Sequence, residues 1–364
     1  MDFWPKRRTI MKKIFSYVII FLIALFLGYT LKQKENYLEI MAVTGATPLA
    51  LKKEVPIDFS LKINGLVKKE YFFSGKALRA FSTTRIRTRE ITPGKKFLGT
   101  YIYEGIPVFN ILEGIAPQKS KDAVFDRPLD LLVTFISTKG EKRYFSYGEL
   151  TMTDDQHPVT LAFDRQQLLP SKDSDKYKLN LYKDNLKGLR LICPREVDNA
   201  RYLDQVERIN FSLLSSPDKL LPKMEKGKKC SSQEIFCCQG ESINEAIFSG
   251  VSEKQIENWV RVGHGRGYKG VSKGEGYNLR SFLKENFPLA KENDFFLFIA
   301  CDGYRSLFSG REIFSTKAGE SFLLLKKLND KTPSGIQMLA PIDDYFVDRD
   351  LWGLSHIACL PTPK

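Results

Sequence analysis

The sequence predicts a mixed α/β protein whose body consists of two similar halves and follows one transmembrane helix. Three observations support this prediction: an uncharged apolar run after a basic N-terminus, short apolar or alternating segments separated by turn residues, and a single recurrence of their order. The 364 residues are 43% hydrophobic and 12% aromatic, values typical of globular proteins. The chain is therefore long enough for two domains, each with its own core.

The N-terminal segment has the pattern of a membrane anchor. Residues 14–31 are uncharged and apolar, and about eighteen helical residues extend roughly 27 Å, near the hydrocarbon thickness of a bilayer. The basic residues before this run favour a cytoplasmic N-terminus and a body outside the cytoplasm. A cleaved signal peptide is the alternative, but no A-x-A-like cleavage site follows. We therefore expect residues 1–31 to form a basic stub and a single-pass anchor in the inner or cytoplasmic membrane, with a periplasmic or cell-surface body.

The formal net charge of +13 is compatible with nucleic acid, an anionic membrane surface or an anionic ligand. Lysine and arginine are spread along the whole chain, and no recognition-helix or zinc-finger pattern accompanies them. We therefore expect no nucleic-acid partner, and a solvated basic surface near anionic lipid headgroups.

After a charged tether at residues 32–54, a first domain is expected at residues 55–214. Its strands and turns are marked by polar–apolar alternation, by glycine and by proline. They are a strand at residues 58–65, a strand, Gly105 turn and short helix at 101–117, an apolar strand at 131–136, a Lys139-Gly140 turn into a strand at 143–147, and a strand at 189–193 that ends at Pro194.

The same order recurs in a second, shortened domain at residues 246–364. The matching positions are Gly105 and Gly276, Gly140 and Gly303, Phe145 and Phe308, Glu149 and Glu312, Arg201 and Arg349, and Ile209 and Ile357. The separation falls from 171 residues at the first pair to 148 at the last, as deletions in the loops of the second copy require. We therefore expect tandem domains joined by a linker at residues 215–245; a coincidental likeness of two mixed α/β segments is the alternative.

Four segments of the first half resemble the molybdopterin-binding domain of sulfite oxidases and their exported bacterial relatives. They are residues 59–67 (FSLKINGLV), 103–108 (YEGIPV) with Ile111-Leu112, 187–194 (KGLRLICP), and 201–209 from Arg201 to Ile209; residues 349–357 resemble the last of these. The resemblance implies a mixed α/β fold, a molybdopterin cofactor and oxidoreductase activity, with an electron-transfer or other periplasmic protein as partner. It also implies one cysteine thiolate on the molybdenum, a soft ligand suited to that metal.

The sequence departs from the family where that cysteine belongs. Residues 83–92 contain no cysteine, the best-aligned position is Thr88, and residues 259–267 of the second half contain none either. Two hypotheses follow: an oxidoreductase-family protein that binds a pterin cofactor or a small anion, or a non-catalytic binding or interaction module that kept the fold and lost the molybdenum ligand.

Six residues are the candidates for ligand binding: Arg85, Arg87, Thr88, Arg201, His264 and Arg349. Arg89 continues the arginine row of residues 85–89. Arg85, Arg87 and Arg89 alternate and would share one face of a strand, where they either clamp a phosphate group or keep a sheet edge from pairing. By resemblance, Thr88, Arg201 and Arg349 lie near the cofactor, although a salt bridge to Asp198 or Asp348 explains the two last arginines equally well. His264 stands in a glycine-rich, basic run that either binds an anion or forms a flexible loop.

The cysteines predict structure more than chemistry. Cys230, Cys237 and Cys238 cluster near the linker, and outside the cytoplasm a disulfide from Cys230 to one of the pair is expected rather than a metal site. Cys193 and Cys301 end apolar strands and are expected to be buried thiols.

Overall fold

The structure, a computed structural model, describes residues 59–153, 157–169, 180–215, 234–239, 242–263, 267–329, 337–339 and 344–363. Residues from Ile57 to the C-terminus form one compact unit. The predicted anchor and tether lie outside the described residues. Within those residues, no helix combines the length and the apolar character that a membrane span requires.

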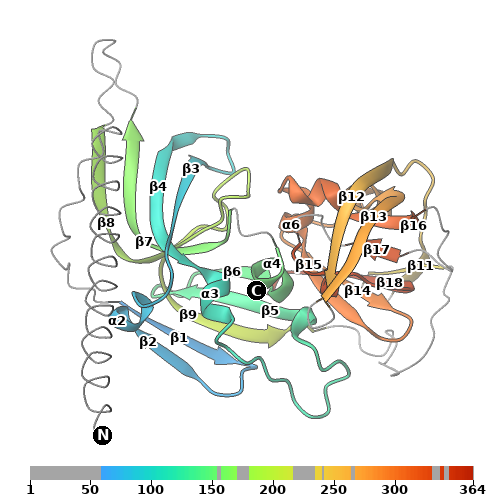
Figure 1. The fold of residues 1–364 in the computed structure, drawn as a ribbon, viewed down its shortest axis with the longest axis horizontal. Helices are drawn as coiled ribbons and strands as arrows, with labels where there is room; N and C mark the ends of the chain where they lie inside the picture. The colour runs from blue at the N-terminus through green and yellow to red at the C-terminus, as the bar shows by residue number, and fades with distance from the viewer. Residues whose placement is uncertain are drawn as a thin grey trace, which may run out of the picture. The chain divides into compact units, whose positions relative to one another are not determined.

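The first half is a mixed α/β arrangement dominated by antiparallel strands (Figure 1). Its strands are β1 (Ser60–Gly65), β2 (Tyr71–Ser74), β3 (Thr84–Ile91), β4 (Phe97–Pro107), β5 (Leu131–Ser137), β6 (Lys142–Ser146), β7 (Thr160–Leu169), β8 (Asn180–Ile192) and β9 (Leu203–Leu213). Its helices are α2 (Gly75–Leu78), α3 (Val108–Leu112), α4 (Tyr147–Thr151) and the 3₁₀ turn η1 (Pro128–Asp130).

The second half also has nine described strands, and its two α-helices precede and follow a strand hairpin, as α3 and α4 do in the first half. Its strands are β10 (Phe236–Gln239), β11 (Ser242–Glu245), β12 (Glu253–Gly263), β13 (Gly267–Asn278), β14 (Phe295–Ala300), β15 (Arg305–Ser309), β16 (Leu323–Leu328), β17 (Gln337–Leu339) and β18 (Leu354–Leu360). Its helices are α5 (Leu279–Asn286), α6 (Gly310–Phe314) and the 3₁₀ turns η2 (Ala318–Ser321) and η3 (Val347–Arg349).

The strand pairings of the two halves correspond. In the first half, β1 pairs antiparallel with β2 and parallel with β9, and β5 joins β9 to β6. In the second half, β10 pairs in the same way with β11 and β18, and β14 joins β18 to β15. The remaining strands follow the order β3-β4-β7-β8 in one half and β12-β13-β16-β17 in the other. In the first half the two groups merge into one nine-stranded sheet through β8 and β9, whereas the described strands of the second half form separate sheets of five and four.

Two pairs of matching glycines occupy matching places. Gly105 and Gly276 both lie at register shifts, of β4 against β7 and of β13 against β16. A side chain on either would enter the next strand, since a Cβ on Gly105 would lie 2.4 Å from the Leu161 carbonyl oxygen. Gly140 and Gly303 have φ angles of +79° and +83° in the hairpin turns before β6 and β15. The expected turn at Gly105 is therefore wrong, because the strand continues through a bulge, while the turn at Gly140 is confirmed.

The apolar faces of these strands fill the cores. One cluster of the first half contains the inward residues of β1, β5 and β9 with α3, including Leu61, Phe135 and Ile209. The main cluster of the second half contains Phe282 of α5, Phe298 of β14 and Ile357 of β18. Short apolar runs with turn residues at their ends therefore predicted these strands correctly.

The predicted linker at residues 215–245 ends too late. β10 begins at Phe236 and β11 at Ser242, and both belong to a sheet of the second half, where β10 pairs with β18. Cys237 and Cys238 are thus buried strand residues rather than linker residues. A run with two adjacent cysteines offers little apolar alternation, so the sequence pattern did not reveal the strand.

Candidate functional site

The arginine row on β3 lies at a sheet edge. β3 is the last strand of the nine-stranded order, and Arg85, Arg87 and Arg89 are exposed on its outer face. Thr88 points to the opposite face, where it is 6% exposed. Arg85 and Arg87 therefore cannot share a ligand pocket with Thr88, because successive strand residues face opposite sides.

Arg201 holds a buried cluster of charges from both halves. Its guanidinium binds the carboxylates of Glu149 and Glu196, and its Nη1 also donates to Ser309 Oγ of the second half at 3.3 Å. Ser309 Oγ donates in turn to Glu149 Oε2 at 2.9 Å. Although burial alone would lower the pKa of Arg201, Glu149 and Glu196 raise it well above its usual value.

Arg349 occupies the matching position in the second half and is fully buried. Its Nε and Nη2 donate to the two oxygens of Asp344 at 2.8 and 2.9 Å, and its Nη1 lies 2.6 Å from Glu312 Oε1. Its guanidinium stacks over Phe308 at 4.4 Å, as that of Arg201 stacks over Phe145 at 4.0 Å. Burial raises the pKa of the neighbouring Glu312, and the negative charges of Glu149 and Asp344 raise it further, against the opposing effect of Arg349.

The structure therefore brings Arg201 and Arg349 to the junction of the halves. A Cβ on Gly148 of α4 would lie 2.3 Å from Arg349 Cδ, so that glycine makes room for the arginine. The salt bridges predicted from Arg201 to Asp198 and from Arg349 to Asp348 are wrong. Asp198 instead accepts a hydrogen bond from Arg311 at 2.8 Å, and Arg349 binds Asp344 and Glu312. The predicted partners were wrong because each arginine takes one carboxylate five residues away, Glu196 or Asp344, and a second one from a distant helix, Glu149 of α4 or Glu312 of α6. His264 lies outside the described residues.

The cysteines also differ from prediction. Cys193, Cys237, Cys238 and Cys359 are free, whereas Cys301, expected to be a thiol, is disulfide-bonded. The predicted disulfide from Cys230 to Cys237 or Cys238 is therefore wrong, because both of these strand cysteines are free. Cys230 itself lies outside the described residues. Burial raises the pKa of the Cys193 thiol and raises that of Cys237 to about 12. Protonated, buried thiols are poor metal ligands.

A basic pocket of about 590 Å³ lies beside β8 in the first half. It collects residues from the β5–β6 turn, from β6, β7 and β8, and from the segment that enters β9. Its lining is Ser137, Lys139, Glu141, Arg143, Arg165, Leu186, Lys187, Gly188, Arg190, Asn199, Tyr202, Leu203, Asp204 and Gln205. Five side chains are cationic and two are acidic, so the lining favours an anion.

Two arginines of this basic pocket are fixed by aromatic rings. The Arg165 guanidinium lies 5.2 Å from the Tyr101 ring centre, and that of Arg190 lies 5.6 and 5.8 Å from the rings of Tyr103 and Tyr202. Arg190 is also held by the buried carboxylate of Glu90 at 3.2 Å and by Asp204 at 3.3 Å. A guanidinium fixed in this way loses little side-chain entropy when it binds a ligand.

Other cations of the basic pocket have weaker partners. Arg143 lies 3.9 Å from Glu141, an exposed and loose pair, and its buried Nε has no hydrogen-bond partner among the described residues. Lys139 and Lys187 form no ion pair with any described residue and are exposed. Gln205, on the wall, has a φ of +56°. Such strain in a residue other than glycine recurs at binding sites, where the surrounding structure maintains it.

The basic pocket can bind an anion, but its described residues do not form a cluster of metal ligands. Among the described residues, no group of three or more His, Cys, Asp or Glu side chains is arranged to hold a metal. The sequence did not single out Arg143, Arg165 or Arg190, because they come from three strands and approach one another only through the strand register. The signal that was present is the basic pair Lys187 and Arg190 around Gly188, whose φ is +140°.

Comparisons with known proteins assign no family. No protein-family model matches the chain, and no curated protein matches it. Among solved structures, the crystal structure of the sulfane dehydrogenase SoxCD from Paracoccus pantotrophus aligns with 14% sequence identity, covering 86% of this chain and 80% of that chain, with a TM-score of 0.30. At this TM-score the two backbones superpose too loosely to transfer a fold or an activity to this chain.

Proposed function

We propose that the protein binds a small phosphate-bearing anion in the basic pocket of its first half. The observation that carries the proposal is the convergence of five cationic side chains on one pocket of about 590 Å³ that two acidic side chains do not neutralise. Arginine forks match phosphate oxygens, and Arg165 and Arg190 are already oriented by tyrosine rings. A phosphorylated pterin is the ligand that the family resemblance of the sequence suggests.

Molybdenum does not fit the residues at the ligand position that the family resemblance implies. The best-aligned ligand position, Thr88, has a hydroxyl that is buried and has no hydrogen-bond partner among the described residues, and a hydroxyl is a poor substitute for a thiolate. Cys193, at the end of β8, is fully buried, and burial raises its pKa. We therefore derive no redox step through a metal, and the non-catalytic binding module becomes the form of the hypothesis that these residues favour.

The proposal extends to the history and the location of the chain. The matched strand pairings and the paired buried arginines support a duplicated domain of the sulfite-oxidase-like molybdopterin-binding type. Anchoring by residues 14–31, with the body outside the cytoplasm, remains a prediction. The disulfide-bonded state of Cys301 supports an oxidising compartment.

A titration with inorganic pyrophosphate tests the proposal. We expect calorimetry to show saturable binding to the full chain, and Arg143→Ala to weaken it by about tenfold or more, because a charge-assisted hydrogen bond contributes roughly 1.5–3 kcal/mol. The matched control is Arg87→Ala, which removes an arginine from the exposed edge strand outside the basic pocket. Equal losses in the two variants, or a loss in the control alone, would place the anion elsewhere and refute the proposal.

Two further measurements separate the hypotheses about the cofactor. Metal analysis of the purified protein gives molybdenum near one per chain for an oxidoreductase and none for a binding module. Thr88→Cys provides the missing thiol on the inner face of β3, the face that carries Glu90, whose carboxylate binds Arg190 of β8. Gain of molybdenum by this variant would show that a pterin site persists beside that strand.

A further inference from the structure

The β3–β4 hairpin carries an unbalanced positive charge on its outer face and tip. Arg85, Arg87 and Arg89 alternate along β3, and Lys95 and Lys96 form the turn. All are exposed, and none forms an ion pair with a residue that the structure describes. Glu104 lies across from Arg85, at the end of the hairpin remote from the turn. Positive charge therefore dominates toward the tip.

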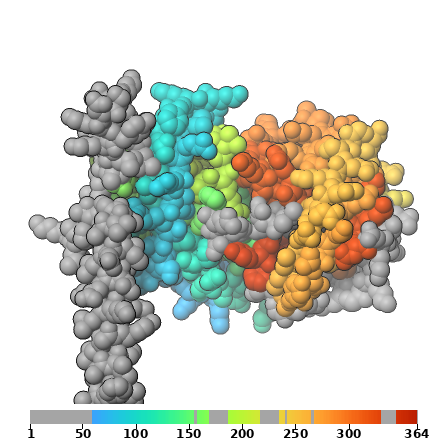
Figure 2. Space-filling model, turned by 45° about the horizontal axis from the view of Figure 1, so that its top comes forward, coloured from blue at the N-terminus to red at the C-terminus, as the bar shows by residue number. Residues whose placement is uncertain are grey.

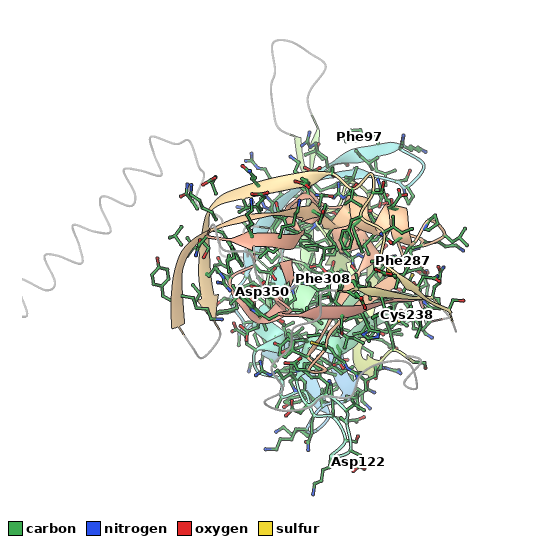
Figure 3. All side chains as sticks on the ribbon, turned by 90° about the vertical axis from the view of Figure 1, so that its right-hand side faces the viewer. Phe97, Asp122, Cys238, Phe287, Phe308 and Asp350 are labelled. Carbon is green, nitrogen blue, oxygen red and sulfur yellow. The ribbon has the colours of Figure 1, made fainter. Side chains whose placement is uncertain are left out.

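Two large apolar side chains stand beside these lysines. Phe97 and Leu98 begin β4 and are 60% and 41% exposed. Figure 2 shows the hairpin at the rim of the molecular surface, and Figure 3 shows Phe97 at the periphery, in contrast to the interior Phe308. Exposed apolar side chains flanked by lysines have the composition of segments that enter the interface of a bilayer.

We propose that the tip of the β3–β4 hairpin docks on an anionic lipid surface. The lysines and the arginine row would lie against the negative headgroups, and Phe97 and Leu98 would enter the boundary between headgroups and acyl chains. Lipid fits better than an acidic protein or nucleic acid, because the apolar pair lies at the apex, where a purely polyanionic partner would leave it in water. The contact is independent of the anion pocket.

Brominated lipids provide a direct test in the full chain, since they quench tryptophan that enters the bilayer. Phe97→Trp adds a reporter at the tip, and the protein with its three native tryptophans supplies the background. Phe72→Trp is the matched control, because Phe72 is 72% exposed on β2, at the other end of the first half (Figure 1). Nanodiscs of neutral lipid are compared with nanodiscs of neutral lipid mixed with phosphatidylglycerol. Because the added tryptophan is in the hairpin, its quenching reports on the hairpin whether or not residues 14–31 enter the lipid.

The proposal predicts quenching of the added tryptophan at position 97 in anionic discs and little quenching at position 72. Combining Phe97→Trp with Lys95→Glu and Lys96→Glu should lower the docked fraction about tenfold or more, since each basic residue near an anionic surface contributes about a fivefold change. These positions are exposed, so unchanged circular dichroism is expected and confirms folding. Absent quenching, or equal quenching at position 72, overturns the proposal. An equal emission shift with single-stranded RNA or polyglutamate in lipid-free solution also overturns it, in favour of a polyanionic partner.

Discussion

Replacing Arg201 by methionine tests whether the buried charges between the halves are structural. The side chain donates to Glu149, Glu196, Ser309 and the Tyr144 carbonyl, and all of these contacts are lost. Glu196 keeps Arg311 at 3.0 Å, but among the described side chains Glu149 keeps only the hydrogen bond from the Ser309 hydroxyl at 2.9 Å. One buried carboxylate is thus left without a cation, which costs about 3–5 kcal/mol of unfolding free energy.

Urea denaturation followed by circular dichroism measures this loss, and a second substitution identifies its cause. Adding Glu149→Gln to Arg201→Met should restore about 1–3 kcal/mol, because a buried amide costs less than an unpaired carboxylate. Arg208→Met is the control: that side chain is 43% exposed and 3.6 Å from Glu207, and its loss should cost less than about 1 kcal/mol. The reasoning is refuted if Arg201→Met costs no more than the control, or if the double variant is less stable than the single one.

Three further predictions concern the backbone, the pH dependence and the thiols. Gly105→Ala should lower the unfolding free energy by about 1–3 kcal/mol, since the new Cβ would collide with backbone atoms. Gly114→Ala should change it little, because a Cβ there would have its nearest neighbour at 3.6 Å. Comparable losses for the two variants in urea titrations would contradict this prediction. Burial raises the pKa of Glu312 from 4.5 to about 8, so the folded protein binds a proton that the unfolded chain has lost, and the unfolding free energy should fall by a few kcal/mol as pH rises between these values. Glu312→Gln should flatten this pH dependence. A wild-type unfolding free energy that does not change over this pH range would exclude the shift. Alkylation of the denatured, unreduced protein should label the four free cysteines named above and spare Cys301, and labelling of Cys301 by mass spectrometry would disprove its disulfide.

The sequence predicted the local structure where periodicity and turn chemistry determine it. The apolar run at residues 295–300 is β14, and the turns at Gly140 and Gly303 have the positive φ angles that glycine permits. The matching of Ile209 with Ile357 agrees with the pairings, since each is adjacent to the first strand and to the central hairpin of its half. The strand at residues 295–300 and the two glycine turns depend on neighbours within a few residues, which a sequence displays directly.

The candidate site was less predictable because its residues meet through long-range pairing. Arg190 reaches Glu90 from a strand one hundred positions later, and Arg201 selects Glu149 rather than nearby Asp198. One error was avoidable: Thr88 lies between Arg87 and Arg89 in a strand, so simple alternation places it on the other face from both. The disulfide could not be inferred from cysteine spacing, since strand pairing and not proximity in sequence determines which thiols are enclosed.

The central claim is that the basic pocket beside β8 is a binding site for a phosphate-bearing anion, and a crystal structure of the protein grown with pyrophosphate tests it most directly. We predict difference density inside the pocket, with phosphate oxygens within hydrogen-bond distance of Arg143 and of at least one of Arg165 and Arg190. Density confined to the arginine row of β3, or a pocket filled with ordered water at saturating pyrophosphate, would contradict the claim.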